Sequence, residues 1–195
     1  MKSVLISVAH SCIAKGAHNA IHAADEYLIS LRASIAAWRT LTGVCAVELF
    51  DCGPLRPNEY DDAKIAKVNG CKPDLAVEIH LNAGGGRYSE VLHKDGSLFG
   101  TTAAKYVAAS LSDGLRPRFA SADLDMRGAR PNTIEKDKNL FFWLERTSCP
   151  ALIVEGLFID REAHIRWLIG QDGQASGAET YGVLVAEGIK RWAAK

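Results

Sequence analysis

The chain has 195 residues, of which 48% are hydrophobic, and this length and composition suit one globular domain with a substantial core. Its 23 Lys and Arg residues are balanced by 23 Asp and Glu residues, so no net charge draws the protein to nucleic acid or to an anionic surface. We expect no nucleic-acid partner, and no membrane span, because no stretch approaches the ~20 consecutive apolar residues that a span needs.

Short apolar runs alternate with segments of helical periodicity along the chain. Strands are expected at residues 3–9, 44–50, 74–80, 89–93 and 151–155. Helices are expected at residues 19–40, 58–70, 98–113, 160–168 and 176–193. Asn58 is the expected N-cap of the second helix, and Gly70 is expected at its end. Residues 114–139 predict a long polar surface excursion, and residues 140–144 fit either a helix or a strand.

Repeated strand–helix–strand units predict an α/β fold. We expect a single domain over residues 1–195, with a twisted, mostly parallel sheet flanked by helices on both faces. No internal repeat and no linker rich in Pro, Ser or Gly divides the chain.

The five cysteines and the N-terminus both indicate a protein that is cytoplasmic as synthesised. The cysteine number is odd, no CxxC pair occurs, and a chain of this size does not need disulfides to fold. The apolar start is shorter than the hydrophobic region of a secretion signal, and cleavage there would remove His10.

Three of the predicted strands end in a polar residue. SVLISVAH ends in His10, DLAVEIH ends in His80 and ALIVE ends in Glu155. Because the carboxyl ends of strands in an open α/β sheet form the ligand crevice, we expect these side chains to converge. With Glu26 from the following helical stretch, the two imidazoles make a three-ligand set that leaves a fourth position for water, the pattern of catalytic zinc.

The helical ligand has rivals in its own neighbourhood. His18, His22 and Glu26 follow one another at four-residue spacing, so we expect them on one helix face. A His-x-x-x-His pair is a zinc-binding spacing only within a fuller motif, and no Glu directly follows His18. A solvated helix face accounts for His18 and His22, while Asp25 points about 100° away from Glu26.

Glu155 is the candidate general base. A carboxylate that ends an apolar strand costs solvation free energy unless it is paired or functional, and burial raises its pKa towards the working range of a base. The alternative is a structural salt bridge to Arg127 or Arg130. Glu78 shares a strand face with His80, so it is placed to orient that imidazole from behind.

Other enzyme classes fit the sequence poorly. The glycines at residues 84–86 are not followed by the Gly-Lys-Ser/Thr of a phosphate-binding loop, and no GxSxG occurs. Cys12 lies near histidines but lacks the surroundings of a thiol nucleophile.

At these residues the chain resembles the zinc-dependent N-acetylmuramoyl-L-alanine amidases of the type 3 catalytic domain, closest to compact phage amidases. The likeness covers nearly the whole chain, and it is carried by VAHS at 8–11, DEYL at 25–28, EIHLNA at 78–83 and PALIVEGLFID at 150–160. The chain departs from the wider family in having Ser11-Cys12 where Gly-Gly often follows the first His. It also has Asp160-Arg161 where an Asn often stands.

The resemblance implies Zn²⁺ held by His10, Glu26 and His80, with Glu155 as the catalytic carboxylate. It implies hydrolysis of the amide between the lactyl group of muramic acid and L-alanine in peptidoglycan, by a protein that acts on the cell wall if released. Zinc would activate water and polarise the carbonyl. Asn82 or Arg127 is a candidate donor to the oxyanion and so a candidate substrate-binding residue.

Two rival functions remain open from the sequence. One is another zinc amide hydrolase or peptidase, which only substrate assays separate. The other is a non-catalytic cell-wall-binding protein on the same fold, although pure binding needs no base. The sequence leaves the oligomeric state open.

Overall fold

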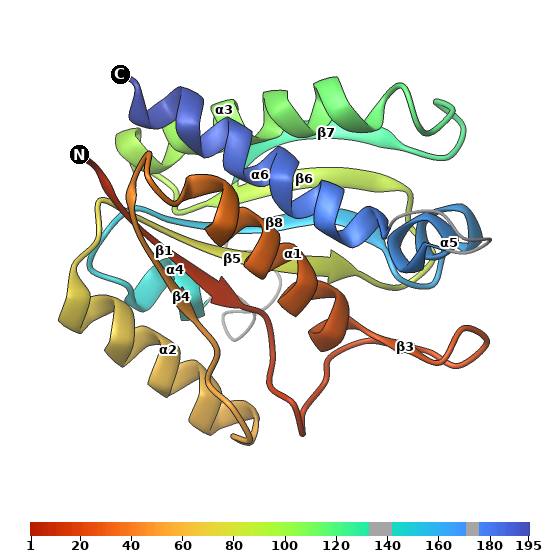
Figure 1. Cartoon of the computed structure of the whole chain (residues 1–195), viewed down its shortest axis with the longest axis horizontal. Coiled ribbons are helices and arrows are strands. Elements are labelled where there is room, and N and C mark those ends of the chain that lie inside the picture. The colour runs from red at the N-terminus through yellow and green to blue at the C-terminus, as the bar shows by residue number, and fades with distance from the viewer. Residues whose placement is uncertain (133–141, 171–175) are drawn as a thin grey trace.

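A six-stranded sheet forms the centre of the protein, in the order β4–β1–β5–β8–β6–β7 (Figure 1). The computed structural model describes residues 1–132, 142–170 and 176–195. The strands of this sheet are β1 Ser3–Val8, β4 Ala46–Phe50, β5 Leu75–Asn82, β6 Tyr88–His93, β7 Asp125–Pro131 and β8 Ala151–Phe158. The helices are α1 Glu26–Leu41, α2 Pro57–Cys71, α3 Leu98–Leu115, α4 Phe142–Arg146, α5 Glu162–Ile169 and α6 Gly177–Ala193.

The sheet is mostly parallel, as predicted. Strands β4, β1, β5 and β8 run in one direction, while β6 is antiparallel to β8 and β7 is parallel to β6. The carboxyl ends of β1, β5 and β8 therefore lie at one edge of the sheet, which is where the three polar strand ends were expected to meet.

Helices cover both faces of the sheet, and the two faces differ. Helices α1, α3 and α6 pack side by side on one face and form the larger core, whereas α2 and α4 lie against the other (Figure 1). On β5, Val77 belongs to the larger core and Ala76 to the smaller one. Since strand side chains alternate, Glu78 and His80 share the face of Ala76, with α2 and α4. None of the helices in the described ranges is long and apolar enough to cross a membrane.

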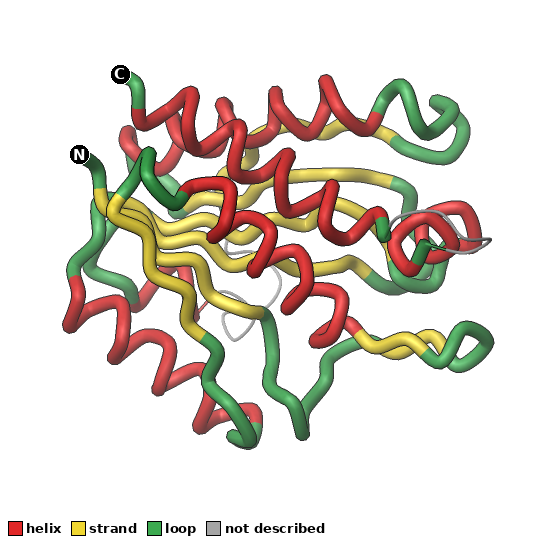
Figure 2. The backbone as a smooth tube through the Cα atoms, in the orientation of Figure 1, coloured by secondary structure: helices red, strands yellow, loops and turns green. Residues whose placement is uncertain are grey.

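The helix expected over residues 19–40 begins only at Glu26. Residues before it form a short hairpin, β2 His18–Asn19 with β3 Ala24–Asp25, which projects from the body of the protein (Figure 2). Asp25 has an extended backbone and its side chain accepts a hydrogen bond from the Leu28 N–H, so it is the N-cap. The spacing of the apolar residues predicts a longer helix because that spacing does not show where the N-cap lies.

The cap expected for the second helix is also wrong. Helix α2 starts at Pro57, Arg56 is its N-cap residue, and the Glu59 carboxylate accepts a hydrogen bond from the Arg56 N–H. Pro57 fits the first helical position, which needs no N–H donor, so the helix starts one residue before Asn58. Its last residue is Cys71 rather than Gly70, and Lys72 caps it with left-handed backbone.

The polar segment expected as a surface excursion contains strand β7, so that prediction is wrong for residues 125–131. Strand β7 is an edge strand, where Arg and Asp side chains and a terminal Pro are tolerated. The ambiguous apolar run belongs to α4 where it is described, from Phe142 onward. Residues 133–141 lie outside the described part of the chain.

Candidate metal centre and active site

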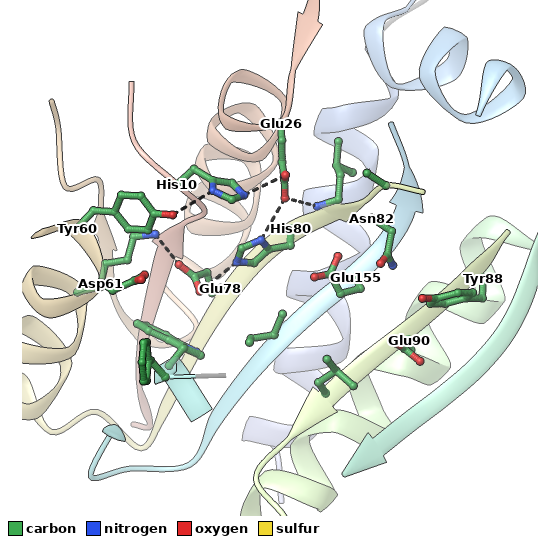
Figure 3. A pocket seen from close by; sticks show the side chains of 17 residues that line it. His10, Glu26, Tyr60, Asp61, Glu78, His80, Asn82, Tyr88, Glu90 and Glu155 are labelled. Carbon is green, nitrogen blue, oxygen red and sulfur yellow. Dashed lines mark hydrogen bonds and ion pairs between the residues drawn. The ribbon is translucent and has the colours of Figure 1, made fainter. Parts of the chain in front are cut away.

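His10, Glu26 and His80 meet at the edge of the sheet (Figure 3). One carboxylate oxygen of Glu26 lies 2.9 Å from His10 Nε2, and the other lies 3.1 Å from His80 Nδ1. One potential ligand atom from each of the three residues falls within 4.8 Å of the other two. The structure thus brings together the three residues that the sequence singled out.

The chain holds Glu26 in place through its backbone surroundings. Glu26 is the first residue of α1, and its oxygens accept hydrogen bonds from the Ala17 and Leu81 N–H groups, both at 3.0 Å. His10 follows β1 with a φ of 61°, in the left-handed region that a residue with a Cβ rarely adopts. Such strain is retained where the surroundings fix one geometry, as at a ligand site.

The outer nitrogens of both imidazoles also have partners. His80 Nε2 lies 3.1 Å from Glu78, and His10 Nδ1 lies 3.3 Å from the Tyr60 hydroxyl. A carboxylate only accepts, so without a bound metal the Nε2–H of His80 donates to Glu78 and its Nδ1–H donates to Glu26. Carboxylates that orient an imidazole in this way are typical of metal ligands. Glu78 thus lies where the sequence predicted it, while Tyr60 was not predicted.

Lys64 extends this network into the core. Its ammonium lies 2.6 Å from Glu78 and 4.6 Å from the centre of the Tyr60 ring, and the side chain is fully buried. Tyr60 and Lys64 are four residues apart on α2, so one helix face supports both histidines. The sequence did offer one signal for this network: Lys64 lies next to Ile65 on the side of α2 that faces the sheet, where a lysine needs a partner.

The charges of the site suit a divalent cation. Burial would raise the pKa of Glu26, but hydrogen bonds from His10 and His80 outweigh it and hold this pKa well below its usual range. Burial acts likewise on Glu78, where Lys64 and His80 lower the pKa to about 2. Buried carboxylates therefore stay ionised beside two imidazoles. Two imidazoles and one carboxylate with their other polar atoms satisfied are a donor set that fits zinc.

Glu155 lies on β8 directly opposite His80 on β5. Burial raises its pKa to about 8, and the nearby charge of His80 only partly offsets this. Within the described residues its Oε2 atom has no hydrogen-bond partner. The alternative salt bridge is not formed, because Arg127 and Arg130 lie 3.9 and 3.5 Å from Glu90 instead.

A cavity of about 490 Å³ joins these groups. Its wall includes the candidate ligands, Glu78, Glu155 and Asn82, whose buried Nδ2 lacks a hydrogen-bond partner among the described residues. Glu90 also faces the cavity, opposite Glu155 on β6, and sequence reasoning missed it. Arg127 does not line this cavity; it lies beside Tyr88, at the cavity's far end.

The rival ligands near Glu26 are elsewhere. His18 is exposed on β2, and His22 Nε2 lies 3.0 Å from Glu162. Asp25 caps α1 and pairs with Lys15. The expectation that His18 and His22 share a helix face with Glu26 is wrong, because the hairpin interrupts the helical pattern.

Tyr181 joins the strands that carry His80 and Glu155. Its hydroxyl accepts from the Gly156 N–H at 2.9 Å and lies 3.1 Å from the carbonyl oxygens of both His80 and Val154. The pairing of β5 with β8 shifts register just after His80, and the hydroxyl satisfies the backbone groups there. No pattern in the sequence pointed to this tyrosine of α6.

Gly16 packs against the site so closely that no side chain fits. A Cβ there would clash with the His10 ring and lie 2.6 Å from Glu26 Oε2, and Gly16 has a φ of 73°. We expect Gly16→Ala to displace both ligands and to abolish most metal binding. Gly53→Ala is the matched control, since Gly53 has a φ of 68° but no atom within 4 Å of an added Cβ. Equal metal content in both variants would contradict the expectation.

We also expect Lys64→Met to weaken zinc binding by about tenfold, the lower end of the effect of losing an outer-shell partner. The unpaired Glu78 would turn from His80 or take up a proton. Competition with a chromogenic chelator measures the affinity. Lys67→Met is the control. It removes a lysine three residues along α2 that pairs with Glu48 at the surface, and it should leave the zinc affinity unchanged. A lower melting temperature with unchanged zinc affinity would assign Lys64 a structural role only.

The chain is similar to known proteins along nearly its whole length. The family model of N-acetylmuramoyl-L-alanine amidases matches residues 4–191. A search of curated protein sequences finds no significant match.

Several solved structures are similar to the chain. Cwp6 from Clostridium difficile has a TM-score of 0.80 and 25% identity, covering 97% of this chain and 29% of that one. The CwlD amidase from Clostridioides difficile, solved in complex with the GerS lipoprotein, has a TM-score of 0.79 and 17% identity, covering 98% of each chain. The catalytic domain of the CD27L endolysin, which targets Clostridia Difficile, has a TM-score of 0.74 and 24% identity, covering 97% of each.

The family match extends over nearly the whole chain and includes His10, Glu26, His80 and Glu155. The chain therefore belongs to the family of N-acetylmuramoyl-L-alanine amidases, hydrolases of the amide that joins muramic acid to the peptide of peptidoglycan.

Proposed function

We propose that the chain is a zinc-dependent peptidoglycan amidase in which His10, Glu26 and His80 hold the ion and Glu155 is the general base. The observation that carries the proposal is the buried Oε2 atom of Glu155, which has no hydrogen-bond partner among the residues that the structure describes and whose residue pairs with His80 of the three-ligand cluster. A zinc ion held there supplies Lewis acidity, which polarises the scissile carbonyl and lowers the pKa of water to about 7.

The protein's own residues handle the protons. Glu155 takes the proton of the attacking water and returns it to the departing amino group of L-alanine. Burial alone keeps Glu155 protonated at neutral pH, since its pKa is about 8. With a cation held by His10, Glu26 and His80, Glu155 would lose its proton at lower pH and so supply the carboxylate that the first step needs.

Other side chains orient the substrate. The Nδ2 group of Asn82 lines the cavity and donates to a carbonyl oxygen of the bound substrate. Glu78 and Tyr60 fix the two imidazoles, so their ligand atoms keep one direction while the substrate binds.

The rival functions make different demands on this site. A wall-binding protein without activity has no use for an unpaired buried carboxyl group, which costs folding free energy. Another amide hydrolase would use the same machinery on a different bond. Digestion of purified peptidoglycan, followed by analysis of new amino groups and of released muramic acid, distinguishes them: new L-alanine N-termini support the amidase.

Metal removal is the direct test of the cofactor. We expect about one zinc per chain after purification without added metal, loss of wall digestion on treatment with a chelator, and recovery when zinc is restored. Full activity in a sample shown by elemental analysis to be metal-free would contradict the proposal.

A further inference from the structure

Strand β7 bulges at Arg127, beside the active-site cavity. Ser89 of β6 pairs with Met126, but the next residue, Glu90, pairs with Gly128, so Arg127 is the extra residue. Gly128 supports the bulge with a φ of 76°. Bulges next to active sites often redirect a side chain. Here the guanidinium of Arg127 lies over the ring of Tyr88, 3.5 Å from its centre.

Tyr88 links this position to the catalytic cavity. It lines both that cavity and a second hollow of about 460 Å³, whose wall also includes Arg87 and Arg127. Phe158 packs edge-on against its ring, with 4.9 Å between ring centroids, and so holds the ring in place. In Figure 3, Tyr88 and Glu90 lie on the far side of Glu155 from the histidines.

The guanidinium of Arg127 stacks on Tyr88 and has two carboxylates nearby, but it makes no hydrogen bond within the described part of the chain. Its nitrogens lie 3.9 Å from Glu90 and 3.9 Å from Asp125. Its side chain is 39% exposed. Glu90 also lies 3.5 Å from Arg130, so two guanidinium groups share this one carboxylate. Guanidinium N–H groups therefore remain for a ligand.

We propose that Arg127, stacked on Tyr88, is a subsite for a carboxylate of the peptidoglycan stem peptide. This inference rests on the proposed function. It states that the stem peptide, rather than the glycan, extends from the scissile amide towards β7. The N-acetylated glycan carries no charge, whereas the stem peptide carries carboxylates, so an arginine site favours the stem. A planar guanidinium binds a carboxylate through two parallel hydrogen bonds.

The spacing of the strands agrees with this assignment. Strands lie about 4.8 Å apart, so β7 is roughly 14 Å from β5, which carries His80. An extended peptide covers about 3.4 Å per residue, and an arginine side chain reaches back part of the way. A stem peptide that extends from the scissile amide across β8 and β6 reaches Arg127 with its first or second residue.

The test compares two soluble muropeptides in one reaction, one with free stem carboxylates and one with the same groups converted to carboxamides. Competition gives the ratio of the two kcat/KM values directly. We expect the zinc-loaded wild-type protein to prefer the acid form by about fivefold, the scale of a partly exposed charge pair. Arg127→Gln should bring the ratio close to one. Arg39→Gln, on α1 at the opposite face of the sheet, should leave the wild-type ratio unchanged.

Two further measurements, a binding titration and the digestion of purified walls, separate this inference from the proposed function. Titration of both muropeptides into Glu155→Gln protein, which hydrolyses them slowly, measures their affinities, and the same preference for the acid form should appear there and weaken as salt is raised. A wild-type protein that treats both forms alike, or an Arg127→Gln variant that keeps the preference, overturns the subsite. If instead purified walls stay intact, the amidase proposal fails, and the titration still decides the role of Arg127.

Discussion

Replacing Glu155 by Gln is expected to lower the rate of amide hydrolysis by roughly 10²-fold or more, the usual scale for a lost general base. The amide keeps the size of the side chain and cannot accept the proton of water. Zinc content should remain that of the wild type, because Glu155 is not among the three clustered ligands. Glu187→Gln, which removes an exposed carboxylate paired with Lys190 on α6, is the control and should retain full activity.

The same substitution should stabilise the metal-free protein in a pH-dependent way. Burial raises the folded-state pKa of Glu155 to about 8 from the ordinary value of 4.5, so the folded protein holds this proton more tightly than the unfolded chain. The wild type therefore loses stability as the pH rises from about 4.5 to about 8. Gln does not titrate, so the variant's advantage in melting temperature should grow across this range.

These two measurements belong on one preparation. A variant that is more stable but inactive indicates a functional carboxylate, whose burial the protein tolerates for the sake of chemistry. Should Glu155 serve a structural ion pair instead, the variant would melt lower and keep most of its activity.

The parts of the site that the sequence predicted share one physical origin. His10, His80 and Glu155 each close an apolar run, and strand order with a common direction is enough to bring such ends together. Glu78 followed from the two-residue period of the same strand. The apolar runs and the two-residue alternation are local patterns, and the succession of strands and helices predicts the parallel sheet that brings the strand ends together.

The parts that were missed depend on contacts between distant segments. Tyr60 and Lys64 reach the histidines only because α2 packs beside β5, and Gly16 matters only because a loop passes over His10 and Glu26. The polar composition of residues 125–131 predicts a loop. Pairing with β6 makes them strand β7 instead. None of these is visible in a window of ten residues.

The prediction of Glu26 as a ligand rested on a helix that begins later than expected, so its test must separate Glu26 from its neighbours. We expect Glu26→Gln to weaken zinc binding by more than the 10- to 100-fold that follows loss of an outer-shell partner. Gln retains an oxygen that can accept from the Ala17 or Leu81 N–H, so the fold should suffer less than in Glu26→Ala.

His22→Ala and His18→Ala should leave the zinc affinity nearly unchanged. His22 lies against Glu162 and His18 is exposed on the hairpin, whereas Glu26 lies between both imidazoles. Metal analysis of the purified variants, together with their melting temperatures, gives the answer. If His22→Ala empties the site while Glu26→Gln keeps its zinc, the ligand comes from the hairpin instead, and the carboxylate between the two histidines serves only to hold their rings.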